Sequence, residues 1–207
     1  MTERLVDRSL RAFSDELASD RPVPGGGSAS AYAGALGAAL GTMVARLASR
    51  KSPGAHEGLI TELESLRADL LRLVDEDSAA YALVADAMKL PRSSEAERRA
   101  RTERVQGALV AAAGVPLEIA KASRKLLDAC GRAVDAAPAA AITDVGVGAL
   151  MAETAIRGAA LNVTINVAAL KDARKAAALA AELESVLDGA DEERARILEL
   201  VESRIAR

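Results

Sequence analysis

Apolar residues recur at intervals of three and four along most of this chain, which is the spacing typical of amphipathic α-helices. Proline, glycine and short polar stretches interrupt this pattern and divide it into segments. The pattern therefore predicts an all-α fold, with helices over residues 3–18, 30–50, 57–89, 94–130, 144–170 and 173–207, the last interrupted at Asp188-Gly189.

Local signals predict where the fourth helix begins, bends and ends. Ser94 and Glu97 have the spacing of a capping box that opens it, and Gly131 is expected to stop it. Pro116 lies well inside this helix and should kink it or mark a break near Gly114.

The third predicted helix carries the most regular apolar pattern, with one acidic exception. Its alternating four-three spacing is typical of a coiled-coil seam, and Asp77 occupies one position of the seam. Because burying an unpaired carboxylate is costly, Asp77 should be paired, exposed by a cavity, or protonated. Burial would raise the pKa of Asp77, as acid–base chemistry near neutral pH requires. An equally good explanation is that Asp77 only fixes the register of packed helices. The apolar members of the seam are Leu59, Leu63, Leu66, Leu70, Leu73, Ala80 and Val84.

Two prolines and three glycines, Gly25, Gly26 and Gly27, separate the first two predicted helices. The prolines stop the first helix, and the glycines allow another group to approach the backbone closely. Ser28 or Ser30 can cap the second helix, whose free N–H groups would then donate hydrogen bonds to a bound anion. A plain helix–loop–helix connection explains the same residues equally well. The spacing fits neither a dinucleotide fingerprint nor a P-loop.

Glycines and cations mark two further features of the second helix. Gly34, Gly37 and Gly41 share one face, where a closely packed helix is a better explanation than a flat ligand. Arg50 and Lys51 end the helix, where cations suit the helix dipole whether or not they also bind substrate.

The fifth predicted helix carries polar residues in an apolar setting. Thr143 or Asp144 is expected to cap it, and Asp144 lies five turns before Asn162 on the same side. Asn162 and Asn166 are one turn apart among aliphatic neighbours, so their amides need partners. Hydrogen bonds across a helix interface are the first explanation, and pairing with a heterocyclic ligand is the second.

Composition bounds the class of protein. The 207 residues suit one domain, 1–207, with a sizeable core, and the net charge of −3 provides no basic field for nucleic acid. Cys130 is the only cysteine, so we expect a reducing, cytoplasmic location. Residues 29–48 are apolar over about a membrane-spanning length, but their alanine and glycine content and Arg46 argue against insertion.

A series of motifs occurs in a fixed order along the chain: Pro24-Gly-Gly-Gly-Ser28, Gly34-Ala-Leu-Gly-Ala-Ala-Leu-Gly-Thr-Met43, Leu73-Val-Asp-Glu-Asp77, Met88-Lys-Leu-Pro91, Gly114-Val-Pro-Leu117, Thr143-Asp-Val-Gly-Val-Gly-Ala-Leu150 and Ala159-Ala-Leu-Asn-Val-Thr-Ile-Asn166. Together they resemble the cyclodeaminase/cyclohydrolase family, folate enzymes related to the C-terminal half of formiminotransferase-cyclodeaminase. The resemblance extends to about Asp172. One departure is the run 47–51, which keeps a basic pair but lacks the aromatic residue found there in many members.

The resemblance implies an antiparallel bundle of about five to seven helices with long central helices, working as a homodimer or larger ring. It implies a formiminotetrahydrofolate cyclodeaminase, which forms 5,10-methenyltetrahydrofolate and ammonia, or a methenyltetrahydrofolate cyclohydrolase. Tetrahydrofolate is the carrier and no metal is implied; one histidine and one cysteine also make no ordinary zinc site. The implied partners are a folate, also in polyglutamylated form, and a separate formiminotransferase. A non-enzymatic helical dimerisation module is the competing class.

Residue type and position suggest catalytic roles for the carboxylates. Asp77 is the leading acid–base candidate, and Asp144 is the other carboxylate. The N–H groups of the three loop glycines, with Ser28, would anchor the substrate or polarise the reacting centre.

The remaining candidates are expected to bind substrate. Asn162 and Asn166 would hold the pterin or orient a carboxylate. Arg50 and Lys51 would meet the glutamate tail, whose negative charge suits exposed cations.

Overall fold

The computed structural model describes residues 4–206, which form helices and connecting loops, so the all-α prediction is confirmed. Two short 3₁₀ turns, η1 and η2, accompany seven α-helices. The elements in chain order are η1 (Leu5–Asp7), α1 (Leu10–Leu17), α2 (Gly26–Ser49), α3 (Glu57–Met88), α4 (Glu95–Ala136), η2 (Ala139–Ala141), α5 (Ile142–Ala168), α6 (Ala173–Leu187) and α7 (Ala190–Ile205).

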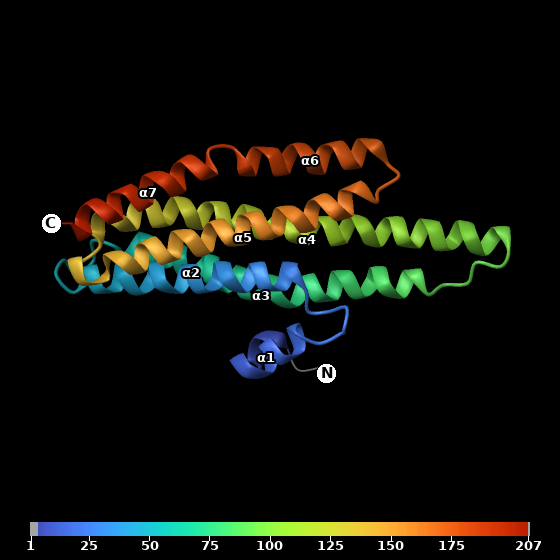
Figure 1. Ribbon diagram of the computed structural model, residues 1–207, viewed down its shortest axis with the longest axis horizontal. Coiled ribbons are helices and arrows are strands. Elements are labelled where there is room, and N and C mark those ends of the chain that lie inside the picture. The colour runs from blue at the N-terminus through green and yellow to red at the C-terminus, as the bar shows by residue number, and fades with distance from the viewer. Residues whose placement is uncertain (1–3, 207) are drawn as a thin grey trace.

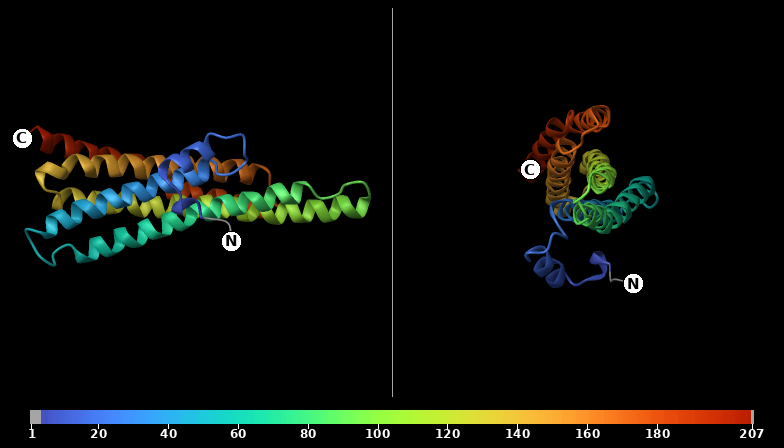
Figure 2. Two further views of the ribbon diagram at one scale, coloured as in Figure 1. Left: turned by 90° about the horizontal axis from the view of Figure 1, so that it is seen from below. Right: turned by 90° about the vertical axis from the view of Figure 1, so that its right-hand side faces the viewer.

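The four long helices α2–α5 form an antiparallel bundle (Figure 1). Helices α2 and α4 each pack against both α3 and α5, and α6 and α7 cover the outside of α4 and α5. Helix α1 stands apart from the bundle (Figure 2). It is linked to the bundle through the ring contact between Phe13 and Tyr32, with centroids 5.5 Å apart. The N–H of Leu5, just before α1, also donates to Asp75 Oδ1 at 2.6 Å.

Two predictions about the packing of the core are confirmed. The seam of α3 faces inward, and its members after the first are buried: Leu63, Leu66, Leu70, Leu73, Ala80 and Val84. The glycine face of α2 serves helix packing, because a Cβ placed on Gly37 would lie 2.9 Å from the carbonyl oxygen of Gly148 in α5. Gly34 and Gly41 face leucine side chains of α3 in the same way.

Two helix starts were predicted in the wrong place, and a third was given the wrong caps. The first predicted helix is divided, because Ser9 caps α1 by accepting the Ala12 N–H at 3.1 Å. Helix α2 begins at Gly26, and neither Ser28 nor Ser30 caps it. Helix α5 begins at Ile142 after η2 and has no side-chain cap. A capping residue in the sequence identifies a helix start only where its side chain accepts a hydrogen bond from the free N–H groups of the first turn.

Helix α4 opens with the predicted capping box but does not stop at Gly131. Gly131 is buried inside the helix, where a Cβ would collide with Glu193 of α7, so this glycine provides space for a neighbouring helix. Pro116 is also accommodated within α4 without ending it. The predicted interruption at Asp188-Gly189 is confirmed, with Gly189 at a φ of 67°.

Within residues 4–206, three segments are long and apolar enough to cross a membrane, judged by length and composition alone: α2, α4 and Ala139–Ala168. Between 39% and 56% of each apolar window is buried inside the protein, so the bundle core uses much of this surface.

Helix α2 begins partway along the bundle, whereas α3 and α4 continue past its first turn (Figure 1). Because Gly27 of α2 faces Asp77, the later residues of α3 lie beyond the start of α2. The α3–α4 hairpin projects there, and we call its residues 81–104 the arm. Between the first turn of α2 and the arm, the bundle is reduced from four helices to three.

Candidate active site

The Asp77 carboxyl group lies against the first turn of α2. A Cβ on Gly27 would lie 2.7 Å from Asp77 Oδ2, so only glycine lets the carboxyl group approach the backbone here. Ser28 is fully buried, and its Oγ lies 2.9 Å from Asp77 Oδ2 and 3.0 Å from both the Val74 carbonyl oxygen and Ser78 Oγ. The loop glycines and the seam carboxylate, more than 45 residues apart, therefore meet.

The hydroxyl group of Ser28 suits both protonation states of Asp77. A hydroxyl has one proton to donate and two lone pairs to accept with. It donates to Oδ2 when Asp77 is ionised. When Asp77 is protonated, the carboxyl group can donate to Ser28 Oγ, and the serine proton goes to the Val74 carbonyl. Ser28 therefore holds the carboxyl group in position by a hydrogen bond from the protein interior, and it is too buried to contact a ligand itself.

Burial raises the pKa of Asp77, and hydrogen bonds from the side chain and backbone of Ser28 offset only part of this effect. Among the residues that the structure describes, no cation forms an ion pair with Asp77. The surroundings thus favour the neutral form of the carboxyl group and raise its pKa, which is the direction of shift that suits a group that gives and takes a proton.

A pocket of about 240 Å³ opens beside Asp77 at the step where α2 begins. Helices α2, α3, α4 and α5 all contribute to it, together with the loop that precedes α2. Because Asp77 lines this pocket, its carboxyl group is not enclosed by the leucines of the seam. Its lining residues are Pro22, Val23, Gly25, Gly26, Gly27, Asp77, Tyr81, Ala112, Asn162 and Asn166.

Pro116 explains the position of Asn166. A proline inside a helix has no N–H and leaves the carbonyl four residues earlier without its helical partner. That carbonyl belongs to Ala112, and Asn166 Nδ2 donates to it at 2.8 Å. The predicted hydrogen bond across a helix interface is therefore present for Asn166.

The two asparagines also leave acceptors at the pocket. Asn162 Nδ2 donates to the Gly158 carbonyl oxygen at 2.9 Å, within α5. Within residues 4–206, no protein donor reaches the side-chain oxygen of Asn162 or of Asn166. These oxygens can accept hydrogen bonds from N–H groups of a ligand, so pairing with a heterocyclic ligand stays a prediction for both residues.

Tyr81 is a pocket residue that the sequence analysis missed. It lies one turn after Asp77 on α3 and is 44% exposed. Its spacing of four from Asp77 is the signal that could have identified it. It is also the only aromatic residue among those lining the pocket, in a chain that lacks the aromatic residue expected in the run 47–51.

Three predicted site residues lie elsewhere. Asp144 shares a face of α5 with Asn162, but eighteen residues of helix separate them by about 27 Å. Arg50 and Lys51 follow the opposite end of α2, and Arg50 lines a separate pocket of about 450 Å³ with Arg46 and other residues. A shared helix face sets the direction of a side chain but not its position along the bundle, so within one chain the structure does not bring these three residues to the Asp77 pocket. Among the described residues, no three His, Cys, Asp or Glu side chains cluster as a metal site would require.

Comparison with known proteins places the chain among folate enzymes. Residues 9–185 match the formiminotransferase-cyclodeaminase family model. A methenyltetrahydrofolate cyclohydrolase of Methylorubrum extorquens is 34% identical over 204 residues, covering 96% of this chain and 98% of the relative. The formimidoyltransferase-cyclodeaminase of Rattus norvegicus is 35% identical over 175 residues, 82% of this chain but 32% of that longer relative. The crystal structure of formiminotetrahydrofolate cyclodeaminase from Thermotoga maritima superposes with a TM-score of 0.83 and 26% identity, covering 95% and 96% of the two chains.

Proposed function

The chain belongs to the formiminotransferase-cyclodeaminase family, and we propose that the Asp77 pocket transfers protons to and from a one-carbon unit held between N5 and N10 of tetrahydrofolate. The observation that carries this proposal is a buried carboxyl group of raised pKa, without an ion pair among the described residues, at the wall of a pocket. As the reaction we propose formiminotetrahydrofolate cyclodeamination. The second candidate is the hydrolysis of methenyltetrahydrofolate. It is supported by the relative from Methylorubrum extorquens, which matches nearly the whole chain and is named a methenyltetrahydrofolate cyclohydrolase.

One carboxyl group is sufficient for the deamination. The formimino group reacts in its protonated form: N10 attacks its carbon, the electron pair of the C=N double bond moves to the nitrogen to leave an amino group, and the Asp77 carboxylate takes the N10 proton as the new C–N bond forms. The protonated carboxyl group then gives this proton to the departing amino nitrogen. Ammonia leaves with the electron pair of its C–N bond, and the methenyl bridge remains. The same group acts first as base and then as acid, which suits a pKa displaced towards neutral pH.

The hydrolysis uses the same sequence with a different nucleophile. Water attacks the methenyl carbon and gives a proton to Asp77. The carboxyl group then protonates N5 as the C–N5 bond breaks, the hydroxyl proton is released to solvent, and 10-formyltetrahydrofolate remains. Both reactions need the bridging carbon beside Asp77, and they differ only in the group that enters or leaves.

The other pocket residues would orient the pterin. The side-chain oxygens of Asn162 and Asn166 lack protein donors among the described residues and can accept from the N–H groups along its edge. The N–H groups of Gly26 and Gly27 begin α2 beside the carboxyl group, where the positive end of the helix dipole stabilises negative charge. We propose no cofactor beyond tetrahydrofolate itself.

Two substrates supplied separately to the purified protein test the proposal. We expect 5-formiminotetrahydrofolate to yield ammonia and the methenyl product, followed by its absorbance. Hydrolysis of 5,10-methenyltetrahydrofolate above the uncatalysed rate would instead select the second candidate. If the folded protein converts neither substrate, the proposed function is wrong.

We propose a homodimer, with a second copy covering an apolar face of α2 and α5. Six large hydrophobic residues on these adjacent helices are exposed, and exposed apolar side chains gathered on neighbouring helices favour an interaction site: Leu36, Met43, Val147, Leu150, Leu161 and Ile165. Light scattering should give the mass of two or more chains, and the mass of one chain would contradict the proposal. We also propose a cytoplasmic location, and a separate formiminotransferase as the enzyme that supplies the substrate. The name of the rat relative, of which this chain spans about a third, includes that activity.

A further inference from the structure

The pocket beside Asp77 is too small for a whole folate. Its volume of about 240 Å³ lies below the range of roughly 300–1,000 Å³ that buries a drug-sized ligand. If the reacting end of the substrate lies at Asp77, its p-aminobenzoylglutamate end must extend out of the pocket. Tyr81 belongs both to the pocket and to the arm, so the arm offers a direction for this.

We propose that the arm binds the p-aminobenzoylglutamate end of the substrate, with Arg92 receiving the glutamate carboxylates. This inference rests on the proposed function of the Asp77 pocket. It also gives a role to the Met88-Lys-Leu-Pro91 motif, which lies outside the pocket.

Two exposed side chains, Tyr81 and Met88, follow Asp77 towards the tip of the arm. Tyr81 and Met88 follow Asp77 by four and eleven residues, which places both within about 40° of its direction on α3. Both side chains are exposed, by 44% and 53%, whereas Val84 of the arm is buried against Leu109, which lies on α4 beyond the arm. Met88 lies about 16 Å along α3 from Asp77, and Arg92 follows the end of that helix, so a substrate whose reacting end lies at Asp77 has to be extended to reach the tip.

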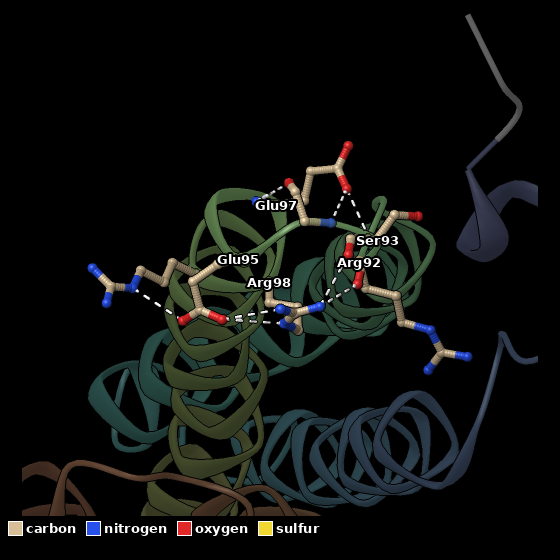
Figure 3. A network of polar contacts seen from close by, with 7 residues as sticks. Arg92, Ser93, Glu95, Glu97 and Arg98 are labelled. Carbon is tan, nitrogen blue, oxygen red and sulfur yellow. Dashed lines mark hydrogen bonds and ion pairs between the residues drawn. The ribbon is translucent and has the colours of Figure 1, made fainter.

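The tip of the arm carries the charge that an anionic tail needs. Residues 86–101 contain five cationic and three acidic side chains, a net charge of +2 in a chain whose net charge is −3. Among the described residues, Arg92 forms no ion pair and no side-chain hydrogen bond, and Figure 3 shows its guanidinium group extending away from Glu95 and Arg98. The other four cations have partners: Lys89 with Asp86, Arg98 and Arg99 with Glu95, and Arg101 with the Met88 carbonyl.

The backbone that presents Arg92 is held in place. Arg98 Nη1 donates to the carbonyl oxygens of Arg92 and Ser93 at 3.3 and 3.0 Å, and Glu97 accepts the N–H groups of Ser93 and Ser94 at 2.8 Å (Figure 3). A cation on a hydrogen-bonded turn needs little further ordering to bind a carboxylate. Arg50, the residue expected to meet the tail, follows α2 at about 36 Å from Gly26, beyond the reach of one folate within a single chain.

Binding of two probes tests this inference without relying on turnover. Tetrahydrofolate and tetrahydropteroate differ only in the glutamate, and calorimetry gives the Kd of each. For an exposed ion pair we expect wild-type protein to bind tetrahydrofolate up to about fivefold more tightly, with a preference that weakens as salt is added. Arg92→Gln should abolish the preference and leave tetrahydropteroate binding unchanged. Arg99→Gln, which removes an equal charge from another part of the arm, should retain the preference.

Four outcomes would overturn the inference. The preference for tetrahydrofolate could survive in Arg92→Gln, or it could be lost in Arg50→Gln and not in Arg92→Gln. Wild-type protein could also bind both probes equally, which would leave the proposed function standing. Wild-type protein that binds neither probe would overturn the proposed function and the inference with it.

Discussion

Replacing Asp77 by asparagine separates its chemical role from its structural one. Asparagine keeps the size of the side chain, and its oxygen can accept the hydrogen bond from Ser28, now 2.9 Å from Oδ2, but it cannot transfer a proton at neutral pH. Losing a general acid–base group typically costs 10²–10⁴-fold in rate, or about 3–5 kcal/mol of transition-state stabilisation. We expect kcat to fall by at least about a hundredfold with little change in the Kd for tetrahydrofolate.

The same substitution should stabilise the fold at neutral pH. Burial raises the pKa of Asp77 in the folded protein, so the unfolded chain ionises first as the pH rises. Ionisation then favours the unfolded chain from about pH 4, the usual range of an aspartate, until the pH passes the folded pKa. Asparagine does not ionise, so the variant does not lose this stability. The free energy of unfolding of Asp77→Asn relative to wild type should be unchanged in acid, rise between about pH 4 and the folded pKa of Asp77, and stay constant at higher pH.

Steady-state kinetics and urea unfolding at acidic and neutral pH measure both effects. Asp75→Asn is the matched control, because Asp75 is two residues away on α3 and accepts the Leu5 N–H outside the pocket. It should keep near-wild-type turnover. Folded Asp77→Asn with turnover within tenfold of wild type would remove Asp77 from the chemistry. A variant less stable than wild type at neutral pH would show that the ionised carboxylate holds the helices together.

Two further predictions concern the residues that shape the pocket. Gly27→Ala places a Cβ where the Asp77 carboxyl group lies, so the carboxyl group must move, and a displacement of about 1 Å should lower kcat by about a hundredfold. Gly58→Ala, with open space around its Cβ, is the control. Unchanged kinetics in both variants would refute the close approach of Asp77 to Gly27. Asn166→Ala should cost about 1–3 kcal/mol in urea unfolding by leaving the carbonyl freed by Pro116 without a donor. In a Pro116→Ala background a helical N–H can return to that carbonyl and the cost should shrink, whereas additive effects would contradict the explanation.

The sequence alone was sufficient for the class of fold and for the unusual residues in it. The helices, the α3 seam and the Ser94 capping box follow from spacing along the chain and are present in the structure. Asp77 could be singled out because a carboxylate among leucines is costly wherever the seam packs. These features depend on residues within a few turns of one another.

Other features depended on contacts between distant helices. Helix α2 begins at Gly26 with Asp77 of another helix at its first turn, so the nearby serines were misleading as caps. Gly131 resembles a helix stop in sequence, but in the structure it makes room for α7. A local signal cannot show whether a residue serves its own helix or a neighbouring one.

The composition of the pocket was decided by the tertiary structure. Spacing gives the direction of a side chain around its helix, but its position along neighbouring helices depends on how the helices are offset. Asp144 and Asn162 share a direction and lie about 27 Å apart, whereas Asp77, Gly27 and the two asparagines meet where α2 begins against α3 and α5. That offset is set by close packing of small and aliphatic side chains over the whole bundle, which no single segment encodes.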